Sequence, residues 1–394
     1  MRLRQGKVPP ATLAILAAIA ALGFTMVERF KVDVREKWYR EKREAAETVK
    51  RSHEVVRELR RKAGLDIDFE KDPDHTGLIG ADDQTGPLTT DKGYLRSKQI
   101  AARPNLAAIV VQLLREAGVG KGDNVAVGLT GSFPGANIAV IVAIEKIGAN
   151  PIVITSVGSS TFGANYAELT WLDMEKALAD AGIIHTRSIA ASVGGDKDKG
   201  IGLNKATIEL INKAIQRNGV EKIEAKTLVD SIARRMELYE ANRKGKPIKC
   251  YVNVGGGLAS VGSSFVADKM IPTGLSPDLK PQTYPVEGVM LKMLRNRVPI
   301  IHLLDFRKLA VEYGISLKEG SVQEVGEGPM FSSRRYNLVL VVGTLVGLAL
   351  IVAAAVRLDL RHTFFGKPAL TPAQPAVTLP RPPESGPGPG EPVL

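Results

Sequence analysis

Two long apolar runs constrain this chain more than any other feature. Val8–Val27 and Tyr336–Val356 each contain no Asp, Glu, Lys or Arg. Each is about 20 residues long, which as a helix spans the roughly 30 Å hydrocarbon core of a bilayer. The arginines beside the second run are placed as interfacial anchors, namely Arg334, Arg335, Arg357 and Arg361. We therefore expect two transmembrane helices in the plasma (inner) membrane, with both chain ends on the same side.

The side of the membrane that holds the middle of the chain stays open. Basic residues occur before the first run, in 1–7, and more of them follow it in 28–42. Read by the positive-inside rule, this places the middle in the cytoplasm, but long segments cross largely regardless of charge. A short basic tail before an apolar run is typical of a signal anchor, so we favour an extracytoplasmic middle. Ala18–Ala20 also resembles a cleavage site, which leaves a removable signal peptide as the alternative for the first run.

The remaining segments differ in composition. Residues 28–64 are rich in Lys, Arg and Glu, with apolar residues at helical spacing, and predict a charged juxtamembrane helical stalk. The stalk is either solvated or packs on a partner helix through Trp38. The boundaries that we expect are a basic tail 1–7, a transmembrane helix 8–27, the stalk 28–64, an acidic connecting loop 65–93, an α/β domain 94–324, a connector 325–335, a transmembrane helix 336–356, and a proline-rich disordered tail 357–394.

The acidic loop 65–93 raises the question of a metal site. Its candidate ligands are Asp72, Asp74, His75, Asp82 and Asp83. Their spacing fits neither an EF-hand nor a zinc signature. We therefore expect a solvated connecting loop and no metal, and the sequence predicts no cofactor.

Short apolar runs alternate with helical patterns through 94–324. This alternation predicts an α/β fold: a mostly parallel, Rossmann-like sheet with helices on both faces. The expected strands are Asn124–Leu129, Pro151–Thr155, Thr186–Ser192, Ile248–Val254 and Val298–Leu304. The expected helices are Ala107–Ala117, Ala136–Ile147, Trp171–Ala181, Lys205–Arg217, Ala225–Arg243 and Glu287–Arg295.

Four of these strands end in small residues. The loops are Leu129–Ser132, Thr155–Ser160, Ser192–Gly195 and Val254–Gly257. Parallel strands place their carboxyl ends at one edge, where ligands bind, so the loops predict a ligand crevice. Tight turns are the alternative explanation. The candidate crevice residues are Thr130, Gly131, Ser132, Asn137, Gly158, Ser159, Ser160, Asn165, Trp171, Asp173, Gly194, Gly195, Gly255, Gly256, Gly257 and Ser260.

The loop around Ser132 fits no standard motif. It lacks the glycine spacing of a dinucleotide fingerprint, the lysine of a Walker loop, and the G-x-S-x-G order of a hydrolase elbow. Pro134 instead indicates a helix entry, with Ser132 as its cap, and the helix start could also hold an anion. Thr170 likewise predicts a cap for a helix carrying Asp173. His185 and His302 fall in expected strands and are interpreted as core residues.

Four stretches together resemble the bacterial poly-γ-glutamate system protein family. They are Arg103–Val140, Thr155–Leu178 ("TSVGSSTFGANYAELTWLDMEKAL"), Tyr251–Ser264 ("YVNVGGGLASVGSS") and Gly326–Asn337 ("GEGPMFSSRRYN"). The resemblance implies a membrane protein that takes part in making or exporting an anionic γ-linked glutamate polymer. It transfers no catalytic residue. The formal net charge of +11 is compatible with an anionic partner.

The sequence therefore favours a membrane-anchored accessory component that binds the polymer or its synthase. The expected partners are the lipid bilayer, other poly-γ-glutamate synthesis or export proteins, and the polymer itself; no nucleic acid is expected. One alternative is an amide hydrolase or transferase with Ser132 or Ser160 as nucleophile. The other is a phosphate- or nucleotide-binding subunit.

Overall fold

The computed structural model describes residues 10–82, 86–262, 271–278, 286–317 and 323–357. The chain divides into two compact units, Met1–Val32 with Arg335–Leu394, and Asp33–Arg334. We call the second unit the α/β body. The basic tail 1–7 and all but the first residue of the proline-rich tail lie outside the described residues.

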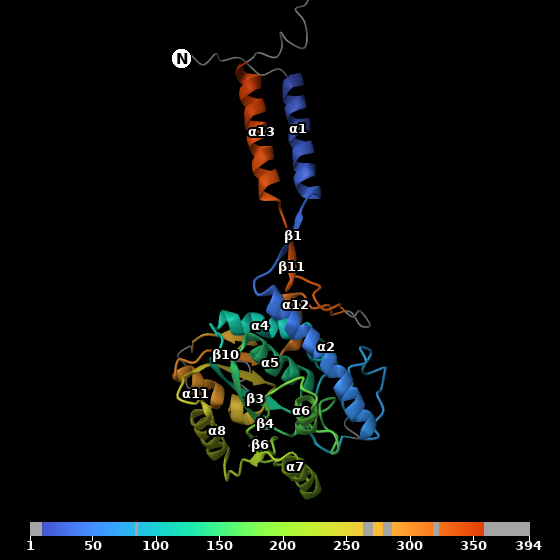
Figure 1. The fold of residues 1–394 in the computed structure, drawn as a ribbon, viewed down its shortest axis with the longest axis vertical. Coiled ribbons are helices and arrows are strands. Elements are labelled where there is room, and N and C mark those ends of the chain that lie inside the picture. The colour runs from blue at the N-terminus through green and yellow to red at the C-terminus, as the bar shows by residue number, and fades with distance from the viewer. Residues whose placement is uncertain (1–9, 83–85, 263–270, 279–285, 318–322, 358–394) are drawn as a thin grey trace, which may run out of the picture. The chain divides into compact units, whose positions relative to one another are not determined.

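The first unit contains helices α1 (Pro10–Arg29) and α13 (Leu338–Arg357), which lie side by side (Figure 1). Both are long and apolar enough to cross a membrane. A Cβ added at Gly23 would come within 2.6 Å of the Thr344 Cγ2, so the helices approach closely at that glycine. At one end of the pair, the Tyr336 hydroxyl donates to the Glu28 carboxylate at 3.0 Å.

The α/β body follows the alternation that the sequence predicts. In chain order its elements are β1 (Val32–Arg35), α2 (Tyr39–Lys62), β2 (Thr89–Asp91), α3 (Leu95–Ala101), α4 (Leu106–Glu116), β3 (Asn124–Thr130), α5 (Pro134–Ile147), β4 (Asn150–Ser156), β5 (Ser159–Ser160), α6 (Trp171–Asp180), β6 (Ala190–Ser192), α7 (Lys205–Arg217), β7 (Glu221–Lys222), α8 (Leu228–Asn242), β8 (Ile248–Val254), α9 (Leu258–Val261), β9 (Gly274–Ser276), α11 (Val289–Arg295), β10 (Ile300–Leu303), α12 (Phe306–Tyr313) and β11 (Ser332–Arg335).

A seven-stranded sheet forms the centre of the body, in the order β7-β6-β4-β3-β8-β10-β9. Neighbouring strands are parallel except for β9, which pairs antiparallel with β10 at the edge. The chain first builds outward from β3 through β4, β6 and β7, then returns to add β8 and β10 on the other side. The expectation of an α/β fold with a mostly parallel sheet is confirmed.

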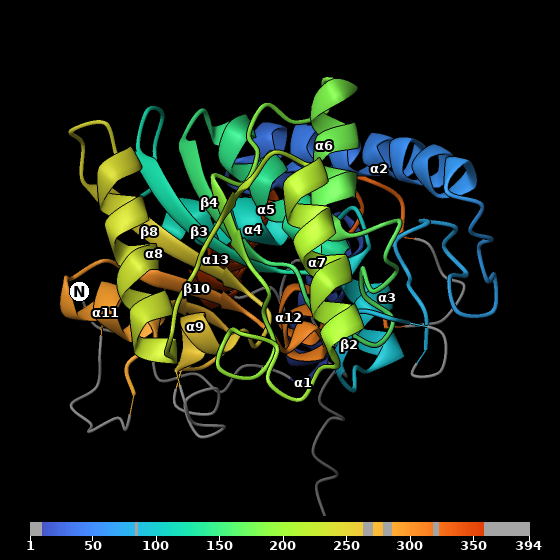
Figure 2. The same cartoon turned by 90° about the horizontal axis from the view of Figure 1, so that it is seen from below.

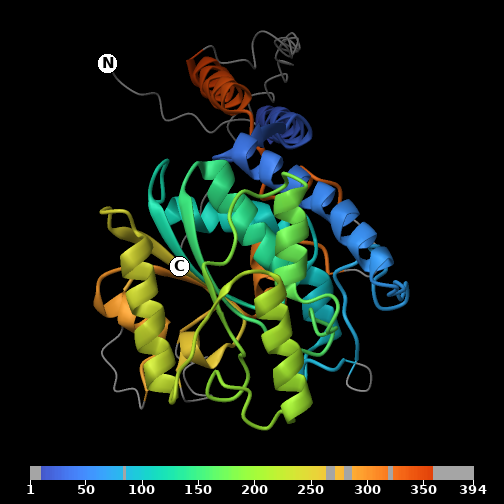
Figure 3. The same cartoon turned by 60° about the horizontal axis from the view of Figure 1, so that its bottom comes forward.

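Side chains of β3 divide between two cores because successive residues of a strand point to opposite faces. Val125 and Val127 belong to the core that includes α2, α4 and α5, whereas Ala126 belongs to the core that includes α8 and α11. Figure 2 shows the strands between these helix groups, and Figure 3 shows olive α8 and blue α2 on opposite sides of them. Helices thus cover both faces of the sheet.

The segment 28–64 contains a helix, as its apolar spacing predicts, but this helix is not a solvated stalk. The helical pattern does not continue from α1, because β1 and a left-handed turn at Trp38 (φ 57°) separate α1 from α2. Nor is α2 solvated: its apolar stripe, including Ala45, Val49 and Val56, is buried against the body. Trp38 itself packs against the same core. The body therefore begins well before residue 94.

The expectation of a solvated loop at 65–93 is also wrong. Leu78 and Leu88 are buried, and the Asp72 carboxylate accepts hydrogen bonds from the backbone N–H groups of Thr76 and Gly77. Asp72 thus satisfies backbone donors inside the body. Within the described ranges, no cluster of three or more His, Cys, Asp or Glu side chains could hold a metal ion. Asp83 lies outside those ranges.

The strand predicted at Thr186–Ser192 forms only at Ala190–Ser192. The backbone N–H groups of His185 and Thr186 donate to the Glu145 carboxylate, and that of Ser188 donates to Glu175. In this segment, glutamate carboxylates accept the backbone hydrogen bonds that carbonyl oxygens of a neighbouring strand would accept in a sheet. His185 is exposed, so its interpretation as a core residue is wrong, whereas His302 is fully buried as expected.

Candidate functional site

A cleft of about 820 Å³ opens at the carboxyl edge of the sheet. All four predicted glycine- and serine-rich loops contribute to it. The predicted residues that line the cleft are Thr130, Ser132, Gly158, Ser160, Gly195, Gly256 and Gly257. The expectation that these loops meet at one edge is confirmed, and their binding of a ligand stays a prediction.

The cleft lies where the strand order reverses, between β3 and β8. Such a switch point leaves a crevice because the connections leave the two strands toward opposite faces. Close packing there requires glycine: a Cβ at Gly255, which has φ +89°, would come 2.5 Å from the Thr130 Oγ1. A Cβ at Gly257 would come 3.0 Å from the Thr130 Cγ2. The loop after β8 can therefore approach the end of β3 only because it lacks side chains at these positions.

A second wall of the cleft comes from segments that the sequence did not single out. Residues 90–94 and 96–98 line one part of it, and Leu304, Asp305 and Arg307 line another. The first segment reaches the edge because β2 pairs in parallel with β5, with Asp91 opposite Ser160. The lining thereby acquires the basic residues Lys92, Arg96, Lys98 and Arg307, together with the acidic residues Asp91, Asp196 and Asp305.

Lys98 connects the two walls. Its Nζ donates to the Ser132 carbonyl oxygen at 2.5 Å and to the Ser160 Oγ at 2.6 Å, and it lies 3.8 Å from the centre of the Phe133 ring. The Lys98 side chain is buried, and burial lowers its pKa from 10.5 to about 7. The cleft thus has a titratable amine beneath one of its serines.

Ser132 does not cap α5, contrary to the prediction. Pro134 occupies the first turn of α5 as expected, but the N-cap residue is Phe133, whose side chain makes no capping hydrogen bond. The Ser132 Oγ instead accepts a hydrogen bond from the Ser160 backbone N–H at 3.0 Å. Ser132 therefore fixes the backbone at Ser160 rather than the helix start.

A buried polar network lies behind the cleft wall. The Asp198 carboxylate accepts hydrogen bonds from the hydroxyls of Ser156, Ser192 and Ser231 and forms an ion pair with Arg235. Ser156 and Ser192 end β4 and β6, so the network joins two strand ends to α8 and to the loop that carries Asp198. Asp198 has φ +59°, a strained conformation for a residue with a side chain. We infer that the network holds this loop in place.

Trp171 and Asp173 do not face the cleft. Trp171 is fully buried in the core. The Asp173 carboxylate accepts from the Thr170 backbone N–H at 2.8 Å, as predicted for the start of α6, and it also pairs with Arg217. Both residues serve the helix and the core, so their inclusion among the crevice candidates is wrong.

The other predicted residues lie behind the cleft surface. Asn137 donates to the Thr130 carbonyl oxygen, and Asn165 donates to that of Ala81. Ser260 exchanges a hydrogen bond with the Tyr251 hydroxyl. The candidates that do not line the cleft are Gly131, Asn137, Ser159, Asn165, Trp171, Asp173, Gly194, Gly255 and Ser260.

Sequence reasoning missed Lys98. It stands in "LRSKQIA", a short helix with no recognisable motif, 62 residues before Ser160. The only available signal is a lysine in a helix that also carries apolar residues, which is common on protein surfaces. The pairing of Lys98 with Ser160 depends on tertiary contacts that the sequence does not reveal.

No protein-family model, curated protein or solved structure matches this chain. A fold class alone does not specify an activity, so the residues of the cleft bear on function most directly.

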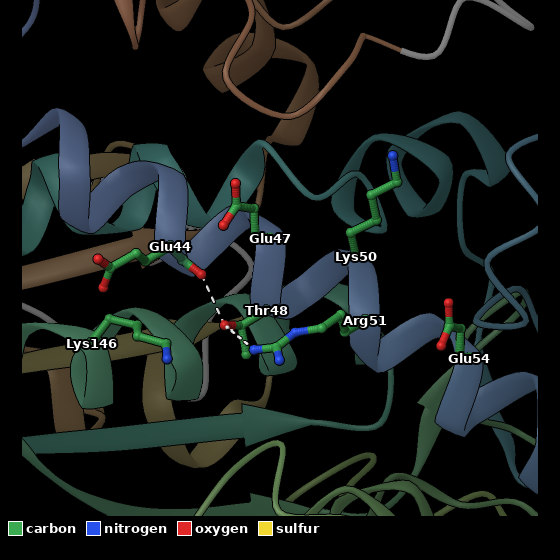
Figure 4. Close-up of a pocket in the computed structure, with 7 residues that line it drawn as sticks. All are labelled: Glu44, Glu47, Thr48, Lys50, Arg51, Glu54 and Lys146. Atoms are coloured by element: carbon green, nitrogen blue, oxygen red, sulfur yellow. Dashed lines mark hydrogen bonds between the residues drawn. The ribbon is translucent and has the colours of Figure 1, made fainter.

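A second depression, of about 560 Å³, lies beside α2 and the end of α5 (Figure 4). It is lined by Glu44, Glu47, Thr48, Lys50, Arg51, Glu54 and Lys146. Both acidic and basic side chains line it, and Figure 4 shows Glu47 and Lys50 pointing away from Lys146. This surface brings no reactive groups together, so the cleft is the stronger candidate site.

Proposed function

We propose that this chain is a membrane-anchored component of poly-γ-glutamate production or export, and that its α/β body binds the polymer in the cleft. The anchor is supported by α1 and α13, which have the length and apolarity of membrane-spanning helices. We place both helices in the plasma (inner) membrane and the body on the extracytoplasmic side. The body belongs to the Rossmann-like class in this proposal, since its strands are added outward on both sides of a switch point.

The observation that carries the proposal is the mixed lining of the cleft. A γ-linked glutamate repeat offers a carboxylate, an amide N–H and an amide carbonyl. Lys92, Arg96 and Arg307 can attract the carboxylates, and the glycine loops let backbone groups approach the amides. The acidic residues Asp91, Asp196 and Asp305 favour this ligand over a polyphosphate, because they oppose a dense negative charge while accepting amide N–H groups.

Binding is tested on the full-length protein in detergent with a defined γ-glutamyl oligomer. Arg307→Glu should weaken binding at least several-fold, because it reverses a charge in the cleft. Lys308→Glu is the matched control: it is the next residue of α12 and is also exposed, but it does not line the cleft. Equal effects of the two substitutions, or equal affinity for an α-linked glutamate oligomer of the same length, would contradict a specific polymer site.

The biological role is tested by deleting the gene in its native host and measuring surface poly-γ-glutamate. We expect loss of polymer, restored by the wild-type gene and less well by Arg307→Glu. Unchanged polymer yield and length in the deletion strain would refute the proposal. A reporter fused after Gly195 tests the extracytoplasmic placement, and a cytoplasmic result would favour the nucleotide-binding alternative instead.

One contact favours a second candidate function, an amide hydrolase or transferase. Of the two serines considered from the sequence, Ser160 is the one whose hydroxyl contacts the Lys98 amine. The contact is compatible with polymer binding alone and with polymer processing.

A further inference from the structure

We propose that Ser160 is a nucleophile, that Lys98 is its proton acceptor, and that the pair cleaves or transfers amide bonds of a carboxylate-bearing chain held in the cleft. The substrate class rests on the proposed function. The nucleophile and its base rest only on the geometry of the described residues.

The distance between the two groups supports proton transfer. The Lys98 Nζ lies 2.6 Å from the Ser160 Oγ, within the range for a nucleophile and its base. Ser160 is partly exposed and lines the cleft, whereas Lys98 lies beneath it with only 3% of its surface exposed. A substrate would therefore meet the hydroxyl, while the amine stays shielded from water.

The surroundings of Lys98 favour its neutral form, which a base requires. No carboxylate among the described residues is within ion-pairing distance of its Nζ, whose partners are a carbonyl oxygen, a hydroxyl and an aromatic ring. An ammonium buried without a counterion is destabilised. The lowered pKa, about 7, means that roughly half of the molecules carry a neutral amine at neutral pH.

Burial alone does not create such a pair, as Lys42 illustrates. Lys42 is also buried, its pKa is lowered by burial, and its Nζ donates to the Met330 carbonyl oxygen at 3.0 Å. Within the part of the chain that the structure describes, it has no hydroxyl partner, and it does not line the cleft. What distinguishes Lys98 is its contact with a serine that a substrate can reach.

The proposed reaction balances without an oxidant, a reductant or a metal. The Ser160 Oγ attacks the amide carbonyl carbon while its proton moves to the Lys98 Nζ. The carbon–nitrogen bond then breaks as the ammonium returns the proton to the departing amine, which leaves an ester on Ser160. Water, or the amine of a second chain, attacks the ester, its proton passes through Lys98 to Ser160, and the carbon–oxygen bond breaks. Serine–lysine pairs can perform this chemistry in place of a serine–histidine–acid triad.

Ser132 is a positioning residue in this scheme. Its hydroxyl accepts from the Ser160 N–H, and its carbonyl oxygen accepts from the Lys98 Nζ, so one residue orients both members of the pair. Replacing Ser132 with alanine removes the first contact and leaves the second. We expect Ser132→Ala to lower the reactivity of Ser160 less than substitution of Lys98 does, and less than the complete loss in Ser160→Ala.

The first test uses the full-length protein in detergent and a fluorophosphonate probe, which labels activated serines without needing the natural substrate. We expect labelling at Ser160, and on the order of a 100-fold to 10,000-fold lower rate in Lys98→Met. Lys98→Arg should also lower the labelling rate, because arginine keeps a positive charge but cannot accept a proton at this pH. Lys42→Met is the control, since Lys42 is also a buried lysine whose pKa is lowered by burial, but it does not line the cleft.

The pH dependence separates a base from a merely structural lysine. The labelling rate of the wild type should rise with pH and level off above about pH 7, and this inflection should disappear in Lys98→Arg. Thermal unfolding of each variant identifies any that fail to fold. A folded Lys98→Arg variant that labels like the wild type would overturn the role of Lys98, and a folded wild type with no labelling at Ser160 would overturn the nucleophile.

The second test measures cleavage of a γ-glutamyl oligomer and, in parallel, its binding. We expect Ser160→Ala to bind the oligomer and not cleave it. Binding by the wild type without cleavage, and without Ser160 labelling, would refute the inference and leave the proposed binding function standing. Labelling of Ser160 without oligomer binding would refute the proposed polymer and retain the catalytic pair.

Discussion

The guanidinium of Arg235 donates from Nη2 to the Asp198 Oδ2 at 3.1 Å, with both side chains almost wholly buried (2% and 1% exposed). The same Nη2 also reaches the hydroxyls of Ser156 and Ser192. The pair therefore joins α8 to the ends of two strands directly behind the cleft. A buried ion pair adds little stability by itself, but it becomes costly when one partner is removed.

We expect Arg235→Met to lower the free energy of unfolding by about 3–5 kcal/mol, because it leaves the Asp198 carboxylate buried without its counterion. Chemical denaturation of the full-length protein measures the change. Arg234→Met is the control, since Arg234 is the neighbouring residue of α8 and forms exposed ion pairs with Glu221 and Glu237. It should cost less than about 1 kcal/mol.

The double variant Arg235→Met with Asp198→Asn identifies the cause of that loss. Asparagine removes the buried charge and tolerates the positive φ of residue 198. Its carbonyl oxygen can still accept from Ser156 and Ser192, while its amide NH2 can donate to the Ser231 hydroxyl. We expect the double variant to be more stable than Arg235→Met alone. If it is no more stable, the uncompensated charge is not the reason for the loss.

Lys98 should make stability depend on pH in the alkaline range. Its pKa is about 7 in the folded protein and 10.5 as the reference value, so the unfolded chain binds more protons between these values. The contribution of neutral Lys98 to the free energy of unfolding is therefore fully present above about pH 10.5. It is lost as the pH falls toward 7. Denaturation at pH 7 and pH 9.5 should therefore show a larger alkaline gain for the wild type than for Lys98→Met.

That comparison isolates Lys98 because the other charged groups of the cleft are present in both proteins. They are Asp91, Lys92, Arg96, Asp196, Asp305 and Arg307. Equal pH dependence of the two proteins would show that Lys98 has an ordinary pKa in the folded state.

His302 should make the body sensitive to acid. Burial lowers the pKa of His302 from 6.5 to about 4, so the unfolded chain takes up a proton first as pH falls. The contribution of neutral His302 to the free energy of unfolding is fully present above about pH 6.5, and it is lost as the pH falls toward 4. Between pH 6.5 and 5 we expect the wild type to lose about 1–2 kcal/mol more than His302→Leu, measured by denaturation.

Two other buried groups titrate in the same range and cancel in this comparison. His53 has a pKa of about 4 and acts in the same direction as His302. Glu175 has a pKa raised by burial to about 7, so its contribution is complete below about pH 4.5 and is lost as pH rises toward 7. His53 and Glu175 are unchanged in His302→Leu. Parallel plots of unfolding free energy against pH for the wild type and His302→Leu would therefore argue against a neutral, buried His302.

Gly23 should be required for the close approach of α1 and α13. Gly23→Leu places a side chain where even a Cβ would lie 2.6 Å from the Thr344 Cγ2, and we expect a loss on the order of 1–3 kcal/mol. Gly343→Leu is the control, because no atom of the described residues lies within 4 Å of a Cβ at that position. Thermal unfolding in detergent of both variants tests this, and equal melting temperatures would contradict the helix contact.

The sequence predicts the centre of the body well, for a local reason. β3, α5 and β4 follow one another with short connections, and their apolar runs are long enough to distinguish strand from helix. The glycine- and serine-rich loops could be placed together because parallel strands share an edge. Only the positions of the strands along the chain are needed to group these loops. The part of the cleft that contains Ser132 and Ser160 could therefore be predicted.

The remaining features depend on contacts between distant residues. The stripe of α2 predicts an apolar face but not what covers it, so the same pattern fits a stalk and a packed helix. Lys98 reaches Ser160 only because β2 pairs with β5. Ser132 resembles a helix cap locally, yet its hydroxyl accepts from a residue 28 positions later. In each case a tertiary partner competes successfully with the local pattern.

The pairing of β1 with β11 brings the first and last segments of the α/β body together. The Glu36 N–H donates to the Phe331 carbonyl oxygen at 2.9 Å, which fastens the entry of the chain to its exit. The body is thus inserted between two apolar helices with its ends joined by their own hydrogen bonds. A protease that cuts the chain once, between the body and either α1 or α13, would leave the body joined to the other helix. Only a cut on both sides would release the body from both helices.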